Sequence, residues 1–234
     1  MQRLDKYLAE AGLESRRKLR DMVRAGRVTV NGATVRSPEQ HIDEMTAVVC
    51  LDGQPIARGD RRIVLMMHKP AGCVTAAKEY LPAEYRKLMP TGRLDMDTEG
   101  LLLFTNDGDL AHRLLAPKRR IEKTYYAEHD GTAGQEDVAA FRAGCELRDG
   151  TKCLPAILEP LGDGKSLVRV CEGKYHQVRR MMASRGMTVR YLRRIAEGGL
   201  TLGTLPVGMT RELTPEEIDA LEAVNFDENF SSQN

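Results

Sequence analysis

The segment TGRLDMDTEGLLLFTNDG, residues 91–108, places two carboxylates two residues apart, immediately before an apolar run. Asp95 and Asp97 follow Arg93 and precede residues 101–104, a stretch typical of a buried strand. An ionised carboxylate held at the start of such a strand can act as a nucleophile or as a base. The plainer interpretation is a solvated turn, which is the commoner role of an aspartate near glycine.

Two further segments carry side chains of interest, EKTYY at residues 122–126 and EGKYHQVRRM at residues 172–181. Tyr125 and Tyr126 are neighbours on a predicted strand, so they should point to opposite faces of the sheet. Taken alone, a strand tyrosine usually packs in a core. His176 is expected to hold the geometry of its loop or to contact a ligand rather than to act in acid–base chemistry.

The elements around these residues predict an α+β fold. Short apolar strands alternate irregularly with helical stretches, which favours a mixed, mainly antiparallel sheet over regular βα units. The helix 176–186 should turn Val178, Met181 and Met182 inward, and Asp109 and Thr214 should cap two other helices. The predicted strands are IVLMMHKP ending at Pro70, GLLLFTNDG, EKTYYAEH and SLVRVCEG.

The N-terminal part of the chain is basic. Residues 1–36 carry nine basic and four acidic side chains, whereas the whole chain has a formal net charge of +1. Two amphipathic helices, the second capped by Ser15, precede a hairpin with Asn31-Gly32 at its turn. A one-sided basic face predicts binding to a polyanion, although many such faces are merely solvated. The residues predicted to bind RNA here are Arg3, Lys6, Arg16, Arg17, Lys18, Arg20 and Arg24.

A second hairpin signal at Asp52-Gly53 and the charged segment RGDRR, residues 58–62, place the domain boundary near residue 60. We predict one domain at 1–60, a second at 61–226 and a disordered tail at 227–234.

Composition narrows the class of protein. No apolar window is long enough to span a membrane, and the N-terminus does not resemble a secretory leader, so we expect a cytoplasmic protein without a membrane partner. The five cysteines form no CxxC pair, which argues against zinc ribbons and disulfide frameworks. No phosphate-binding loop of the G-x-x-x-x-G-K-[ST] type occurs.

The helix–helix–hairpin unit with VTVNG resembles the S4-like RNA-binding domain. KPAG (69–72), GRLD followed by D-T-x-G-L-L-L, EKTY and EGKYHQVRRM, in this order, resemble the RsuA-type pseudouridine synthases, which act on small-subunit ribosomal RNA. The resemblance extends from RLDKYLA to RELTPEEI, nearly the whole chain. It implies an N-terminal S4-like domain followed by a pseudouridine synthase catalytic domain.

The resemblance also implies roles for individual residues. It makes Asp95 the essential catalytic group, with Tyr125, Arg179 and Arg93 supporting catalysis or substrate binding, and it pairs Arg179 with Asp95. Asp97 is then a turn residue and Glu99 a loop residue. The residues expected to contact RNA in this domain are Lys69, Lys174 and Arg180. No cofactor or metal is expected, because the isomerisation adds no atoms to the substrate.

The function predicted from the sequence is therefore site-specific conversion of uridine to pseudouridine in small-subunit (16S) ribosomal RNA, by base flipping and an essential aspartate. The partner is a structured small-subunit segment or an assembly intermediate, and the protein is expected to be a monomer. Three alternatives remain: the same reaction on large-subunit (23S) RNA, a non-catalytic ribosome-assembly factor, and a glycosidase using Asp95 and Asp97. The EKTY motif and the lack of a long basic C-terminal extension favour the small subunit. Two carboxylates so close in one loop are poorly placed to flank a sugar.

Overall fold

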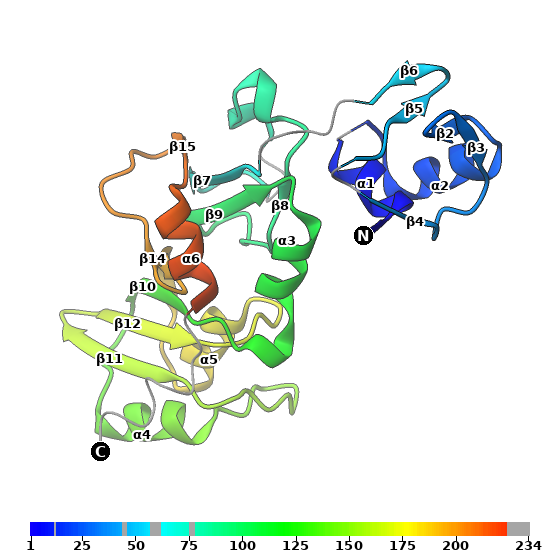
Figure 1. Cartoon of the computed structure of the whole chain (residues 1–234). Helices are drawn as coiled ribbons and strands as arrows, with labels where there is room; N and C mark the ends of the chain where they lie inside the picture. The colour runs from blue at the N-terminus through cyan, green and yellow to red at the C-terminus, as the bar shows by residue number, and fades with distance from the viewer. Residues whose placement is uncertain (12, 44–45, 57–61, 75–77, 224–234) are drawn as a thin grey trace. The chain divides into compact units, whose positions relative to one another are not determined.

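The computed structural model describes residues 1–11, 13–43, 46–56, 62–74 and 78–223 (Figure 1). The chain divides into two compact units, Met1–Ile63 with Asn106–Gly108, and Val64–Thr105 with Asp109–Asn234. The predicted boundary at residue 60 and the predicted tail at 227–234 lie outside the described residues.

The first unit packs two helices against short antiparallel strands around one apolar core. Ser15 caps the second helix as predicted, since its Oγ accepts a hydrogen bond from the Lys18 backbone N–H at 3.5 Å. The predicted hairpin is confirmed as well, because Asn31 and Gly32 take φ values of 51° and 81°. Its elements are β1 Gln2–Arg3, α1 Leu4–Glu10, α2 Arg16–Arg24, β2 Val28–Val30, β3 Ala33–Val35, β4 His41–Ile42, β5 Val49–Leu51 and β6 Gln54–Pro55.

A buried carboxylate joins the two helices of this unit. Asp5 on α1 is 0% exposed and accepts hydrogen bonds from Arg3 at 3.1 Å and from Arg20 at 2.9 Å. Burial raises the pKa of Asp5, but the two guanidinium groups more than offset this and hold the pKa below its usual value. Arg3 and Arg20, both predicted to bind RNA, are therefore ion-pair partners within the fold, whereas Arg16, Arg17, Lys18 and Arg24 are exposed.

The second unit is built on one large sheet. Among the described residues it has nine strands in the order β11-β12-β10-β13-β9-β7-β15, with β14 paired to β13 and β8 paired to β9. The predicted α+β fold with a mixed, mostly antiparallel sheet is confirmed. The strands are β7 Val64–Lys69, β8 Met89–Pro90, β9 Glu99–Thr105, β10 Lys123–His129, β11 Ile157–Gly162, β12 Lys165–Val170, β13 Val189–Glu197, β14 Leu200–Thr201 and β15 Thr210–Glu212.

Helices cover this sheet and create two separate cores (Figure 1). Leu110 and Leu114 of α3 (Gly108–Leu115) and Ile218 and Leu221 of α6 (Pro215–Ala223) pack on β7 and β9. The other core lies under α4 (Gln135–Ala143) and α5 (Gln177–Ser184), and it contains the predicted inward residues Val178, Met181 and Met182. Three short 3₁₀ turns complete the list: η1 Lys78–Tyr80, η2 Ala83–Tyr85 and η3 Pro117–Arg119.

The two halves of the sheet meet at a short parallel pairing of β9 with β13. Only Arg193↔Glu99 and Arg194↔Gly100 are paired there, whereas the flanking β7–β9 and β10–β13 ladders are antiparallel and longer. Gly100 has φ +120°, and a Cβ on it would lie 2.2 Å from the Arg194 carbonyl oxygen. The junction therefore requires a residue without a side chain at position 100.

Several elements were not predicted from the sequence. The helix α4 and the strands β11 and β15 lack a strong periodic pattern, because β11 is largely exposed and β15 is only three residues long. The helix α3 begins at Gly108, one residue before the predicted cap at Asp109. Thr214 does cap α6, where its Oγ1 accepts from the Glu217 backbone N–H at 3.3 Å.

We expect Gly100→Ala to lower the free energy of unfolding of the second unit by about 3 kcal/mol or more, because the new methyl group meets the β13 backbone. The control is Gly150→Ala, which has φ +79° but no heavy atom within 4 Å of the added Cβ. It should cost only about 1 kcal/mol. Urea denaturation of both variants checks this, and equal losses would show that the junction is not tightly packed.

Candidate active site

Asp95 lies in the loop between β8 and β9, at the edge of a small cavity. A turn holds this loop, since the Thr98 backbone N–H donates to the Asp95 carbonyl oxygen at 3.1 Å. The cavity measures about 170 Å³, and its walls include Arg93, Asp95, Tyr125 and Lys174. Drug-sized ligand sites occupy roughly 300–1,000 Å³, so a cavity of this size suits a single small planar group. Four predicted site residues from three separate segments thus meet at one place.

Lys69 fixes the backbone of the Asp95 loop from beneath. Its side chain is fully buried, and its ammonium group donates to the carbonyl oxygens of Pro70, Asp95, Met96 and Thr98 at 3.0–3.3 Å. Burial lowers the pKa of Lys69, and the neighbouring carboxylates of the loop act in the opposite direction. The prediction that Lys69 contacts RNA is wrong, because a side chain at the end of a strand buried on both faces points into the protein.

The cationic neighbours of Asp95 differ from the predicted ones. The predicted pairing of Arg179 with Asp95 is wrong: Arg179 lies 3.0 Å from Asp97 Oδ2 and also donates to the carbonyl oxygens of Asp97 and Val189. The Nε2 atom of His176 lies 3.6 Å from Asp95 Oδ1 instead. His176 is the N-cap of α5, and Arg179 lies three residues further along, inside the helix.

Tyr125 presents part of its ring to the cavity and packs the rest against the core under α5. Burial raises the pKa of Tyr125, while the Arg194 guanidinium beside it acts in the opposite direction. The phenol is therefore neutral near pH 7 and offers an aromatic face rather than a base. Arg194 is itself buried, donates to the Leu101 carbonyl oxygen at 2.7 Å and lies 3.3 Å from Glu197. This ion pair was not predicted from the sequence.

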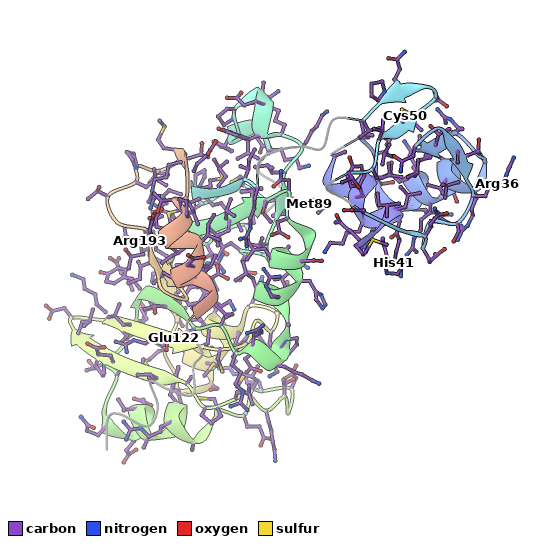
Figure 2. The ribbon with its side chains drawn as sticks, in the orientation of Figure 1. Arg36, His41, Cys50, Met89, Glu122 and Arg193 are labelled. Atoms are coloured by element: carbon purple, nitrogen blue, oxygen red, sulfur yellow. The ribbon has the colours of Figure 1, made fainter. Side chains whose placement is uncertain are left out.

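Tyr126 occupies the opposite face of β10, as the strand alternation predicts. Its ring meets Tyr191 edge-on, with centroids 6.3 Å apart, and lies under the guanidinium of Arg193 at 5.8 Å. Figure 2 labels Arg193 on β13 and Glu122 just before β10. Tyr126 is not among the residues that line the Asp95 cavity.

Glu99 is not the loop residue that the sequence analysis expected. It is the first residue of β9, and its Oε1 lies 3.0 Å from His68 Nε2 and accepts from the Tyr191 hydroxyl at 2.8 Å. These contacts anchor the strand immediately after the Asp95 loop. The signal that could have revealed this was the polar His68 at the end of an apolar strand, since buried polar groups require partners.

The loop of the EGKYHQ segment forms part of the cavity wall, and hydrogen bonds between its own residues hold it in place. Gln177 Oε1 accepts from the Lys174 backbone N–H at 2.9 Å, and Gln177 Nε2 donates to Glu172 at 2.8 Å. The Lys174 ammonium also pairs with Glu172.

Arg180, predicted to bind RNA, lies 2.5 Å from Asp149 and donates to the Tyr175 carbonyl oxygen. Glu172, Tyr175 and Gln177 line the cavity too, and the sequence analysis had assigned them no role.

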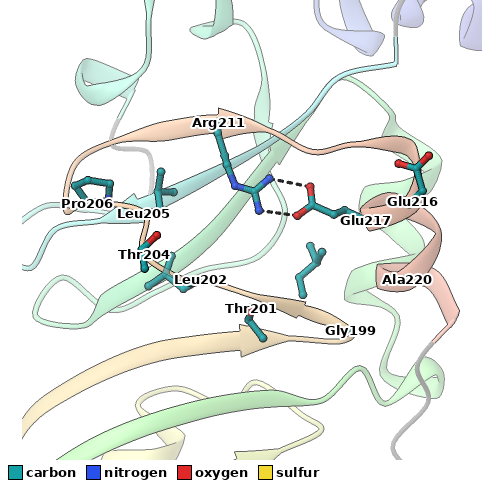
Figure 3. Close-up of a pocket in the computed structure, with 12 residues that line it drawn as sticks. Gly199, Thr201, Leu202, Thr204, Leu205, Pro206, Arg211, Glu216, Glu217 and Ala220 are labelled. Carbon is teal, nitrogen blue, oxygen red and sulfur yellow. Dashed lines mark hydrogen bonds and ion pairs between the residues drawn. The ribbon is translucent and has the colours of Figure 1, made fainter.

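A larger cavity of about 620 Å³ lies elsewhere in this unit, between the β14–β15 connection and α6 (Figure 3). Its charged side chains include Arg211 and Glu217, which already neutralise each other through two hydrogen bonds of 2.7 and 2.6 Å. None of the predicted catalytic residues lines it. The smaller cavity at Asp95 is therefore the candidate active site.

The two units of the chain match two different family models. A family model described as RNA pseudouridylate synthase matches residues 63–184, more than half of the chain, and a model of the S4 domain matches residues 2–48. The chain belongs to the RNA pseudouridine synthase family and is an enzyme of that class. Membership of this class agrees with the predicted fold and reaction. It argues against the glycosidase and the non-catalytic assembly factor that were the alternatives.

Individual relatives cover almost the whole chain. An uncharacterized RNA pseudouridine synthase of Bacillus subtilis, YtzG, is 39% identical, covering 94% of this chain and 98% of the relative. The ribosomal large subunit pseudouridine synthase B of the same organism is 34% identical, with 96% and 97% covered. A crystal structure of a pseudouridylate synthase matches with a TM-score of 0.69 at 33% identity, covering 94% of this chain and 100% of that chain.

Among the described residues, no helix has both the length and the apolar character needed to cross a bilayer.

We expect Lys69→Met to lower the free energy of unfolding by about 2–4 kcal/mol, because it leaves buried carbonyl oxygens without a donor. The Asp95 loop should also lose its position, with kcat reduced roughly a hundredfold. Pseudouridine formation and urea denaturation, measured on the same preparation, check both effects. The control is Lys165→Met on the exposed side of β12, which should change neither quantity. A fully active Lys69→Met variant would contradict the role assigned to the ammonium group.

Proposed function

We propose that this protein isomerises uridine to pseudouridine in ribosomal RNA, with Asp95 as the catalytic group. The observation that carries the proposal is the convergence of Asp95, Tyr125 and Arg93 on one cavity of about 170 Å³ in a chain of this family. The cavity admits a single base, so the target uridine leaves its stack to enter it. Unstacking costs a few kcal/mol and is easiest in a loop or a distorted helix.

The reaction breaks the N1–C1′ bond, turns the uracil and joins C5 to C1′. C5 then loses its proton and N1 gains one, so product and substrate have the same composition. The Asp95 carboxylate supports it in one of two ways: it attacks the substrate as a nucleophile, or it removes the C2′ proton so that a glycal forms. Tyr125 holds the detached uracil by stacking, which contributes about 1–3 kcal/mol per base in single-strand binders. The neutral phenol suits this role because it does not repel the carboxylate.

Basic side chains lie near the Asp95 carboxylate. The imidazole of His176 lies 3.6 Å from the carboxylate, and Arg93 and Lys174 line the same cavity. The basic side chains also attract the phosphates that flank the target, and such contacts position RNA without reading its bases. Arg179, through its ion pair with Asp97, acts on the shape of the loop rather than on the carboxylate of Asp95.

The substrate we propose is a structured segment of small-subunit ribosomal RNA, or an assembly intermediate that contains it. The EKTY motif of β10 supports this choice. The similarity to the Bacillus subtilis ribosomal large subunit pseudouridine synthase B favours a second candidate, the large-subunit RNA. We further propose that the protein acts in the cytoplasm as a monomer, and that its S4 domain supplies binding energy through the exposed basic face of α2.

The Asp95→Asn variant should bind ribosomal RNA nearly as tightly as the wild type and form no detectable pseudouridine, because the amide can act neither as nucleophile nor as base. Mass-tagged mapping of pseudouridine in both ribosomal RNAs, after incubation with each protein, makes this measurement. The matched control is Asp97→Asn, the other carboxylate of the loop, which should retain activity within about tenfold.

Each outcome of the mapping has a defined meaning. A single new site in small-subunit RNA, absent with Asp95→Asn, supports both the reaction and the substrate. A site in large-subunit RNA alone keeps the reaction and replaces the substrate. Turnover by Asp95→Asn would remove Asp95 from the catalytic role.

Replacing Arg16 and Arg17 together by alanine should weaken RNA binding and reduce the slope of log Kd against log salt by about 1.5, because two phosphate contacts are lost. Both side chains are exposed on α2 and should leave the fold intact. The control is the pair Arg142→Ala and Arg190→Ala on the second unit, whose side chains are also exposed. Filter binding from low to moderate salt measures the slopes. An unchanged slope in the Arg16 and Arg17 variant would show that α2 does not contact RNA.

A further inference from the structure

Tyr175 is an aromatic side chain that the reaction as described so far does not use. It lines the Asp95 cavity, and yet it is 69% exposed. A large aromatic ring that projects into solvent at the mouth of a site is unusual, because tyrosine normally buries much of its surface.

The ring of Tyr175 is supported by the ring of the next residue along the chain. It is stacked on the imidazole of His176, with centroids 3.9 Å apart and an interplanar angle of 17°. His176 in turn lies beside Asp95. The stack therefore runs outward from the catalytic carboxylate to solvent, and the exposure of Tyr175 leaves room for another flat group on its ring.

The backbone beneath this ring is held firmly. The Tyr175 carbonyl oxygen accepts from Arg180, the Gln177 backbone N–H donates to the Lys174 carbonyl oxygen at 3.2 Å, and His176 takes a left-handed conformation with φ 49°. A non-glycine residue in this conformation persists only where its surroundings impose it. The ring is consequently presented in advance, which reduces the entropy lost when a ligand stacks on it.

Given the proposed function, on which this inference rests, the geometry points to Tyr175 as the stacking surface for an unpaired nucleobase that flanks the target uridine. The cavity has room for one base, and Tyr125 provides the face inside it. The next nucleotide of the same strand must then lie at the cavity mouth, where Tyr175 is exposed. Every base has a π-face, so this contact requires an unstacked neighbour rather than a particular base. The substrate class is thus RNA with at least two consecutive unpaired nucleotides at the target.

Kinetics separate this role from a purely structural one. Tyr175→Ala should raise KM for the ribosomal RNA transcript roughly tenfold and change kcat by less than about twofold, because a remote base contact is lost while the chemistry is unaffected. Tyr175→Phe should restore KM to within about twofold of the wild type. The matched control is Tyr80→Ala on η1, where the side chain is 42% exposed, and its KM should not change.

The absence of tryptophan from the sequence allows a direct optical test. In an Asp95→Asn background, Tyr175→Trp places the sole tryptophan at the proposed surface, and Tyr80→Trp serves as the control. In vitro transcripts of small- and large-subunit ribosomal RNA should quench the fluorescence of the first variant and not that of the second. Wild-type turnover is measured on the same transcripts.

The outcomes are distinguishable. Quenching together with a raised KM for Tyr175→Ala supports the inference. Binding without quenching, or a variant that loses kcat at unchanged KM, overturns it and assigns Tyr175 to the support of His176. A wild-type protein that forms no pseudouridine in either RNA overturns the proposed function, while the fluorescence result still decides whether Tyr175 contacts a base.

Discussion

The short parallel pairing between β9 and β13 is the constraint on which the active site depends. It joins two antiparallel halves of the sheet through Arg193↔Glu99 and Arg194↔Gly100, and Gly100 makes the close approach possible. The Asp95 loop leads into β9, which forms one side of this junction. Tyr125 lies on β10, the strand next to β13 on the other side. The carboxylate and the aromatic ring therefore come from different halves of the sheet and meet only because the junction is formed.

Buried polar groups maintain this arrangement. Lys69 holds four carbonyl oxygens around the Asp95 loop, Glu99 anchors the start of β9 through His68 and Tyr191, and Arg194 binds the Leu101 carbonyl oxygen beneath the junction. Each such group would be costly to leave unpaired in a core. Their hydrogen bonds hold the backbone of the Asp95 loop in place, and a site that is organised in advance needs little reorganisation during a reaction.

In the proposed function, the S4 unit and the catalytic unit contribute different kinds of contact to RNA recognition. Exposed arginines on α2 suit long-range attraction to phosphates, which is strong but independent of sequence. The cavity at Asp95, with Tyr125 inside and Tyr175 at its mouth, suits short-range contact with bases. The buried Asp5 in the first unit indicates that part of its positive charge stabilises the fold, so the number of basic residues overstates the number available to RNA.

The amino-acid sequence was enough to predict the α+β class, the helix cap at Ser15 and the turn at Asn31-Gly32. It also pointed to Asp95 and Tyr125 as candidate site residues. These depend on local pattern and on motifs, which are legible along the chain. The folded chain was needed to show that Lys69 is buried, that Arg179 pairs with Asp97, and that His176 lies beside Asp95. The reason is physical: a motif gives the order of charged groups, but which of them pair depends on the direction of each side chain from its helix or strand.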